Sequence, residues 1–314
     1  MGHSSTSLRS FALLYLFFQV ILAVLFGFFT QYAESTSLEQ DTKFYQPLLN
    51  VVVMIFIGFG FLMTFLSRYG YSALSYTYLL ACFTLQWAVL TNHFFRCMFD
   101  ERGPIFMLVP VSFVALLEAA FCSGAVMISL GAVLGKLSPV QLLLMTAIEV
   151  PLFSVVLGLL ERLDVSDIGG SMGVHTFGAY FGLAVMWMQT KGASAKPLRN
   201  AIALDGSAWK ARYDSDVSAM SGTLWLWVYW PSFVAAMCPP THFARSVVNT
   251  FLALAASGGS VFVYSALFRH GHRPSAVGST APSDVTAGIM LVPTRAPKHP
   301  GDMRPRGCKQ LTLV

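Results

Sequence analysis

The sequence predicts an all-α protein, a polytopic transmembrane bundle of about eight helices. Two observations carry this prediction. Of the 314 residues, 55% are hydrophobic and only 11% are charged, whereas soluble domains carry about 25% charged residues. The hydrophobic residues also gather in long blocks that lack the two-residue alternation of barrel strands. We therefore expect helices of about 20 residues, each long enough to cross the hydrocarbon layer.

Eight hydrophobic blocks of roughly this length follow one another along the chain. They are Leu13–Phe29, Val51–Leu66, Tyr76–Leu90, Phe106–Leu134, Val140–Leu160, Val174–Met188, Leu224–Met237 and Val247–Phe268. We interpret the first block as a retained span, because the bulky residues after it do not form a signal-peptide cleavage site. Residues 1–268 then form a membrane domain, and residues 269–314 form a separate tail.

Charges between the blocks predict the orientation of the chain in the membrane. The connection between the sixth and seventh blocks is the most basic, and Lys and Arg mark the cytoplasmic side. Its basic residues are Lys191, Lys196, Arg199, Lys210 and Arg212. An even number of spans then puts both termini in the cytosol. The tail is basic and rich in proline, so we expect a disordered segment that touches anionic lipid.

Few ionisable residues fall inside the hydrophobic blocks. They are Glu118, Glu149 and His175, with Asp167 at the entrance of the sixth block. Such residues are functional candidates because ionisable groups are costly in lipid. Asp167 can cap the sixth helix by accepting from the backbone N–H of Gly169 or Gly170. His175 would then lie two turns further in, about 12 Å along the axis.

Small residues surround His175 at helical spacing, and two interpretations of this pattern remain open. These residues are Ser171, Gly178, Ala179 and Gly182. In one interpretation, Gly178 and Gly182 form a helix-packing face and a neighbouring helix satisfies the histidine. In the other, the imidazole forms the wall of a narrow passage. The five cysteines and seven histidines show no metal-ligand spacing, and we expect neither a cofactor nor an enzymatic site.

Four stretches of the chain carry a family resemblance. They are IFIGFGFLMTFLSRYGYSALSYTYLLACFTLQWAVL (55–90), GAVLGKLSPVQLLLMT (131–146), DIGGSMGVHTFGAYFGLA (167–184) and GTLWLWVYWPSF (222–233). In this order they resemble the Rhesus (Rh) glycoproteins of the Amt/Mep/Rh ammonium transporter family. The resemblance implies an ammonia or ammonium channel in the plasma membrane, with carbon dioxide as a further candidate substrate. It also implies a homotrimer or a hetero-oligomer with other Rh proteins, and no nucleic-acid partner.

The resemblance assigns a role to four residues. His175 matches the first pore histidine, and Asp167 matches the buried acidic residue that supports the vestibule. Phe121 and Phe233 match a pair of stacked phenylalanines that gate an apolar pore. The physical pattern agrees with these roles, because an imidazole beside small residues suits the wall of a narrow path.

The resemblance fades after Phe268. Rh glycoproteins continue there into further spans, one of which carries a second pore histidine, whereas this sequence enters its basic, proline-rich tail. We therefore expect a chain that is shortened on the carboxy-terminal side. Two functions are compatible with this expectation. One is an ammonia channel with a histidine-lined hydrophobic pore, and the other is a non-transporting Rh-family membrane subunit or truncated isoform without its own pore.

Overall fold

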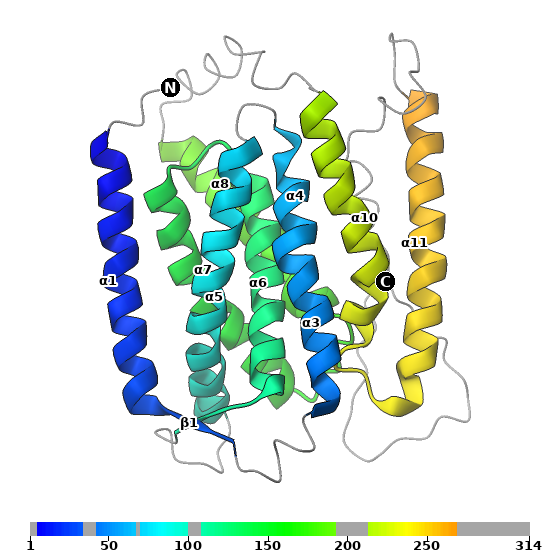
Figure 1. The fold of residues 1–314 in the computed structure, drawn as a ribbon. Helices are drawn as coiled ribbons and strands as arrows, with labels where there is room; N and C mark the ends of the chain where they lie inside the picture. Colours follow the sequence, from blue (N-terminus) through cyan, green and yellow to red (C-terminus); the bar gives the residue numbers. More distant parts are fainter. Residues whose placement is uncertain (1–4, 34–41, 67–69, 100–107, 193–212, 269–314) are drawn as a thin grey trace.

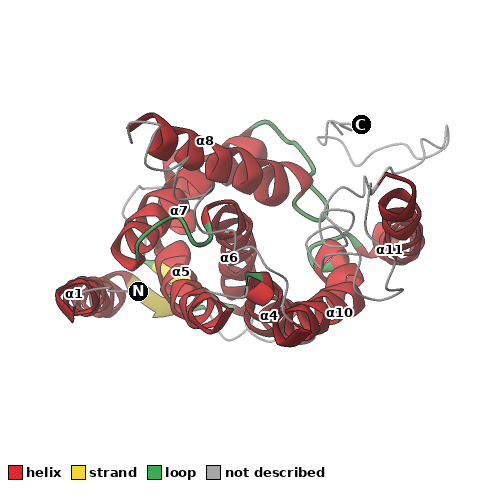
Figure 2. Cartoon of the chain, turned by 90° about the horizontal axis from the view of Figure 1, so that it is seen from above, coloured by secondary structure: helices red, strands yellow, loops and turns green. Residues whose placement is uncertain are grey.

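The computed structural model describes residues 5–33, 42–66, 70–99, 108–192 and 213–268. Its long helices run side by side in one bundle (Figure 1). Viewed along the bundle, α6 (Phe113–Val133) lies inside a ring of other helices. Helices α1 (Ser5–Phe29) and α11 (Pro240–Phe268) lie at opposite edges (Figure 2). The central helix α6 is therefore the one around which a site can be assembled.

The remaining elements are mostly helical. In chain order they are β1 (Thr30–Tyr32), η1 (Thr42–Phe44), α3 (Tyr45–Val53), the π-helix η2 (Met54–Phe59), α4 (Gly60–Leu62), η3 (Met63–Phe65), α5 (Gly70–Phe99), β2 (Val109–Val111), α7 (Pro139–Arg162), the π-helix η4 (Ser171–Thr176), α8 (Phe177–Gly192) and α10 (Tyr213–Ala235). Helix α5 packs against α6 and α7, and α6 packs against α8. Helix α10 packs against α3, η2, α4 and α11.

The prediction of a multi-pass helical membrane protein is confirmed. Within the described residues, five helical stretches are long and apolar enough to cross a membrane. They are Arg9–Phe29, Thr42–Phe65, Gly70–Phe99, Phe113–Val133 and Pro139–Arg162. The other three predicted blocks also fall on helices, namely η4 with α8, α10 and α11. Five of the eight predicted spans thus meet the length and composition of a span, and all eight lie mostly on helical segments.

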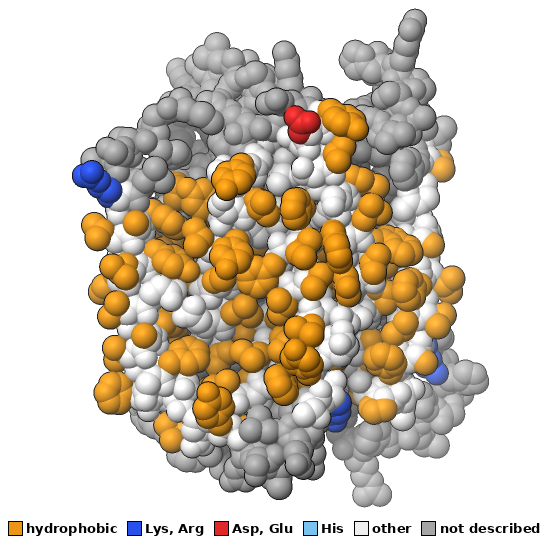
Figure 3. Space-filling view, viewed as in Figure 1, with side chains coloured by type: hydrophobic (Ala, Val, Ile, Leu, Met, Phe, Trp, Pro, Cys, Tyr) orange, Lys and Arg blue, Asp and Glu red, His pale blue; other side chains and the backbone are white. Residues whose placement is uncertain are grey.

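Hydrophobic side chains cover the flank of the bundle. In Figure 3 they extend over most of its height, while the visible Lys, Arg, Asp and Glu side chains lie near its two ends. Leu13, Phe17 and Phe28 of α1, for example, are more than half exposed. In water this surface would favour aggregation, whereas lipid tails solvate it at no cost. The surface therefore agrees with a membrane location.

The fourth predicted block, Phe106–Leu134, is wrong at its amino-terminal end. The helix begins only at Phe113, where the Ser112 side chain accepts a hydrogen bond from Ala115 N at 3.3 Å. Just before it, β2 pairs in parallel with β1, with Pro110 opposite Gln31. Pro110 lies within this extended segment, and the N-cap Ser112 starts the helix after it. The all-helical prediction therefore missed two short strands, because hydrophobicity alone does not locate caps.

The GKLSP turn joins α6 to α7 as its residue types dictate. Gly135 has a φ of +74°, a left-handed conformation that glycine adopts without a steric penalty. Ser138 then starts α7 with a capping box: its side chain accepts from Gln141 N, and the Gln141 side chain accepts from Ser138 N. This box satisfies backbone N–H groups that the first turn leaves free. The turn therefore sends α7 back alongside α6.

Helix α1 begins and α11 ends at the same end of the bundle (Figure 1). This agrees with the even number of spans expected from the sequence. The predicted cytosolic side depends on the basic residues between α8 and α10 and on the tail 269–314, and most of that connection and the whole tail lie outside the described residues. The cytosolic orientation and the boundary at residue 268 therefore stay predictions.

Candidate functional site

The turn between α7 and η4 is built around the carboxylate of Asp167. It accepts hydrogen bonds from Gly173 N at 2.7 Å and from Met172 N at 3.1 Å. Gly169 and Gly170 have φ angles of +78° and +68°, and this left-handed conformation favours glycine. The turn thus folds the carboxylate back over the free N–H groups of the first helical turn, where negative charge is stabilised.

Asp167 is therefore a helix cap, as the sequence suggested, but its predicted donors were wrong. The expected donors were the N–H groups of Gly169 and Gly170. Both glycines belong to the turn, and Gly170 is the N-cap residue of η4. The unpaired N–H groups lie after the N-cap, so the carboxylate reaches Met172 and Gly173 instead.

His175 lies one turn into the helix rather than two, because residues 167–170 are not helical. Its ring nitrogen Nδ1 is 3.0 Å from the carbonyl oxygen of Gly170. A carbonyl can only accept, so Nδ1 must carry a hydrogen, and in the neutral ring Nε2 is then a hydrogen-bond acceptor. The backbone of the turn thus fixes both the orientation and the tautomer of the imidazole.

An aromatic cluster joins this imidazole to the central helix. The rings of Phe121 on α6 and Phe233 on α10 have centroids 4.8 Å apart and meet edge to face, at 83°, rather than stacked. The His175 ring lies 5.8 Å from Phe233 and 5.5 Å from Trp230. The structure therefore brings together three residues that the family resemblance singled out. It adds Trp230, one turn before Phe233 on the same face of α10, which the sequence analysis missed.

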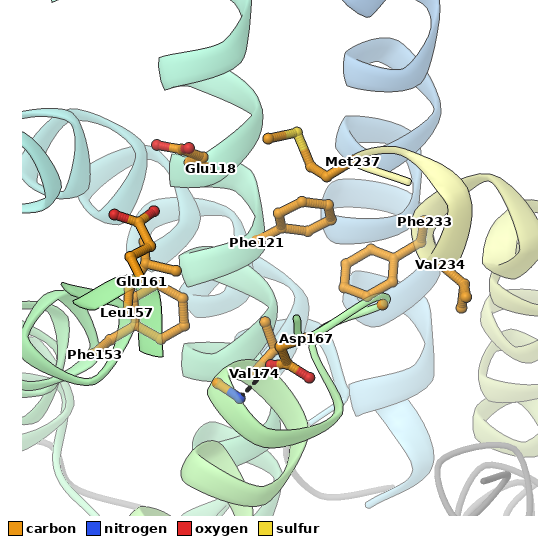
Figure 4. Close-up of a pocket in the computed structure, with 13 residues that line it drawn as sticks. Glu118, Phe121, Phe153, Leu157, Glu161, Asp167, Val174, Phe233, Val234 and Met237 are labelled. Carbon is orange, nitrogen blue, oxygen red and sulfur yellow. Dashed lines mark hydrogen bonds between the residues drawn. The ribbon is translucent and has the colours of Figure 1, made fainter. Parts of the chain in front are cut away.

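A cavity of about 150 Å³ opens beside the two phenylalanines. Figure 4 shows the ring of Phe121 next to that of Phe233, with Glu118, Glu161 and Asp167 around them. The three carboxylates come from α6, α7 and the turn before η4. Val174 lines the cavity but His175 does not. The imidazole therefore contacts Phe233 without reaching the cavity itself.

Two of these carboxylates share one arginine. Arg96 of α5 makes two hydrogen bonds to Glu118, at 3.0 and 3.1 Å, and two to Glu161, at 2.6 and 2.8 Å. The Glu118 side chain is only 13% exposed, whereas those of Arg96 and Glu161 are about 40% exposed. Arg96 and Glu161 lie just outside the hydrophobic blocks predicted from the sequence, and the structure places them on α5 and α7. The sequence could have placed these two residues on helices only by extending the blocks Tyr76–Leu90 and Val140–Leu160 beyond their last hydrophobic residue.

The residues around the cavity carry a net negative charge. Glu118, Glu161 and Asp167 are three acidic groups, and Arg96 is the basic group bound to two of them. With all four groups ionised, the local charge is −2. A concave, partly apolar site with this charge concentrates cations. The arrangement therefore favours a small cation at the cavity.

Gly178 and Gly182 pack α8 closely against α6. A Cβ atom on Gly178 would lie 2.7 Å from the Ala125 carbonyl oxygen, and one on Gly182 would lie 3.0 Å from the Ser129 Cα. His175, in contrast, turns toward α10. The residues that the sequence placed together at helical spacing therefore face two directions. The glycines face α6, and the imidazole faces α10.

Comparison with known proteins identifies the family of this chain. The model of the Ammonium Transporter Family matches residues 11–282. The Ammonium transporter Rh type C of Canis lupus familiaris is 43% identical over 277 residues, covering 82% of this chain and 57% of that protein. The Ammonium transporter Rh type B of Oryzias latipes is 42% identical over 80% of this chain and 55% of that protein. The chain thus spans a little over half the length of these relatives.

The fold has a counterpart of known structure. Rh50 of Nitrosomonas europaea, from the Rhesus protein family of channels, is 31% identical with a TM-score of 0.61. The similarity covers 81% of this chain and 65% of that one. The family match includes η4, the aromatic cluster and the carboxylates of the cavity. The chain described here therefore belongs to the ammonium transporter family, and its similarity is to the Rh branch.

Proposed function

We propose that this chain conducts ammonia or ammonium across a membrane, along a path that passes Phe121, Phe233 and His175. The observation that carries the proposal is the position of the edge-to-face phenylalanine pair, which has an acidic cavity beside it and an imidazole in contact with one ring. The names of its relatives, which are ammonium transporters, support the same substrate.

The cavity would collect the charged form of the substrate. The carboxylates of Glu118, Glu161 and Asp167 raise the local concentration of cations. The ring faces of Phe121 and Phe233 attract a cation that has lost part of its water. A buried monovalent cation still carries a desolvation penalty of several kcal/mol. We therefore expect the ion to transfer a proton to a carboxylate or to water at the cavity and neutral ammonia to continue.

His175 would form the wall beyond the phenylalanines. With Nδ1 engaged by Gly170, the neutral ring offers Nε2 as an acceptor for an N–H group of ammonia. The rings of Trp230 and Phe233 beside it exclude water and hydrated metal ions. Asp167 acts indirectly, because its hydrogen bonds from Met172 N and Gly173 N hold the first turn of the helix that carries the histidine.

A flux measurement tests this proposal. The full chain is reconstituted in liposomes, an ammonium gradient is applied, and the internal pH is followed per folded molecule. We expect flux above that of empty liposomes and a several-fold decrease in His175→Ala. His242→Ala is the matched control, because His242 lies at the start of α11, outside the aromatic cluster. Absence of flux in well-folded chain would contradict the proposal and favour a non-transporting subunit.

Phe233→Ala tests the gate separately. Removing this ring opens the contact with Phe121, so we expect methylamine and water to pass more readily while ammonia flux persists. Phe28→Ala is the matched control, since Phe28 is 74% exposed on α1. If Phe233→Ala discriminated between ammonia and methylamine as well as the unsubstituted chain does, a gate at this position would be contradicted.

The orientation in the plasma membrane and the assembly are part of the same proposal. We expect both termini to be cytosolic and the chain to form a homotrimer or to join other Rh proteins. A glycosylation reporter fused after Val314 should stay unmodified in cells. Crosslinking in intact membranes should give trimers. A glycosylated reporter or a monomer would require these parts to be revised.

A further inference from the structure

One further acidic side chain, Glu149, lies away from the cavity, in the interior of the bundle. Glu149 of α7 is 0% exposed and sits where α7, α6 and α8 meet. Its Oε1 atom is hydrogen-bonded to the Ser129 hydroxyl of α6. The same hydroxyl lies 2.9 Å from the carbonyl oxygen of Gly178 on α8. Three helices are thus linked through one serine.

Counting hydrogens in this chain of contacts fixes where they must lie. The Ser129 hydroxyl has one hydrogen, and the Gly178 carbonyl can only accept. If the serine donates to the carbonyl, its oxygen can only accept from Glu149, and the carboxyl group must then carry a proton. If the serine instead donates to an ionised Glu149, two acceptor oxygens face each other at Gly178. The first arrangement satisfies both contacts.

The surroundings of Glu149 also disfavour a charge. Within the described residues, its other oxygen, Oε2, is buried without a hydrogen-bond partner. Among the described residues, Cys122 is a titratable neighbour of Glu149, and its buried thiol supplies no positive charge. A buried carboxylate with neither a cation nor a full set of donors is strongly unfavourable. If Glu149 is a neutral acid, Oε2 is a carbonyl oxygen, and leaving it without a hydrogen-bond donor costs less than leaving a charged oxygen so.

We propose that Glu149 is held as a neutral carboxylic acid whose proton completes a hydrogen-bonded chain from Glu149 through Ser129 to Gly178. This chain fixes α8 against α6 and α7. Gly178 lies three residues after His175, so Glu149 is a positioning residue for the imidazole. That last step depends on the proposed transport function, whereas the protonation of Glu149 does not.

Infrared difference spectroscopy on the full chain in lipid tests the protonation. Unsubstituted chain should show a protonated carboxylic-acid carbonyl band that disappears in Glu149→Gln. In Ser129→Ala the band should persist at a shifted frequency, because the acid loses its acceptor. Glu118→Gln is the matched control, since Glu118 is paired with Arg96 and should leave the band unchanged. Loss of a carboxylate band instead of an acid band in Glu149→Gln would overturn the proposal.

Flux per folded molecule tests the positioning role. Glutamine is neutral, nearly isosteric and able to donate to Ser129, so Glu149→Gln should conduct like the unsubstituted chain. Glu149→Leu removes the hydrogen-bond donor to Ser129. It should therefore lower flux several-fold, although His175 itself is unchanged. Equal flux in Glu149→Leu and the unsubstituted chain would overturn the positioning role. Should the leucine variant not fold, Ser129→Ala provides the same comparison. The infrared result stands independently of whether the chain transports.

Discussion

Glu118 is a mostly buried and Glu149 a fully buried carboxyl group in neighbouring hydrophobic helices, and the bundle stabilises them in different ways. At the cavity, Glu118 is paired with Arg96, which also binds Glu161. In the interior, Glu149 contacts a serine hydroxyl and no described cation. A long arginine can reach the end of the bundle and keep part of its side chain in solvent. Glu149, between α6, α7 and α8, is 0% exposed.

The difference teaches where charge is tolerated in this protein. Near the cavity, an arginine or backbone N–H groups donate hydrogen bonds to the acidic side chains, as for Asp167. In the interior, we propose that the acid stays neutral. The proposed substrate path begins beside the first environment, at the cavity, whereas Glu149 lies on the opposite side of η4 and α8 from the aromatic cluster. The acidic cavity and the interior around Glu149 thus differ in how they stabilise a carboxyl group. Three substitutions would test this difference.

Arg96→Leu should have the largest effect. It leaves Glu118 buried without its counter-ion and beside Glu161, and breaking a buried pair in this way costs about 3 kcal/mol or more. Because Arg96 is partly exposed, we expect the lower end of that range. Thermal unfolding in detergent would measure it. The triple variant Arg96→Leu, Glu118→Gln, Glu161→Gln should recover most of the stability, and a triple variant as unstable as the single one would contradict the pairing argument.

Gly178→Ala should have an intermediate effect in the interior. Its Cβ atom would lie 2.7 Å from the Ala125 carbonyl oxygen, so α8 must shift away from α6, at a cost of about 2 kcal/mol. Gly258→Ala is the matched control, because no atom lies within 4 Å of its Cβ position. That change should be neutral or slightly stabilising, since alanine favours helix. Similar melting temperatures for the two variants would show that the α6–α8 contact is loose.

Asp167→Asn should have the smallest effect on stability. Asparagine keeps one acceptor oxygen but loses the charge that favours the helix start, a change of about 1 kcal/mol or less. Asp164→Asn is the matched control, because Asp164 is exposed and asparagine tolerates its φ of +52°. Unfolding and flux should be measured together. If Asp167→Asn lost as much stability as Arg96→Leu, the carboxylate would have a structural role greater than capping.

Much of the fold could be predicted from the sequence, because a membrane span is defined by local composition. All eight predicted blocks lie mostly on helical segments, and the largest part of a block outside a helix is the start of the fourth. The resemblance also selected Phe121, Phe233 and His175, whose rings lie together in the structure. Their role in a pore stays a prediction. Hydrophobic length and a few motifs were sufficient for these inferences.

Only the tertiary structure decided which polar groups meet. Arg96 and Glu161 are 65 residues apart in sequence, and Ser129 meets Gly178 from 49 residues away. Such contacts depend on how far each helix is rotated about its axis and shifted along it. Nearly continuous hydrophobicity leaves both quantities undefined, since every face of the helix resembles the others. The sequence therefore determined that the chain forms a helical membrane bundle and which segments become helices, while packing determined that Glu118 pairs with Arg96 and Glu149 with Ser129.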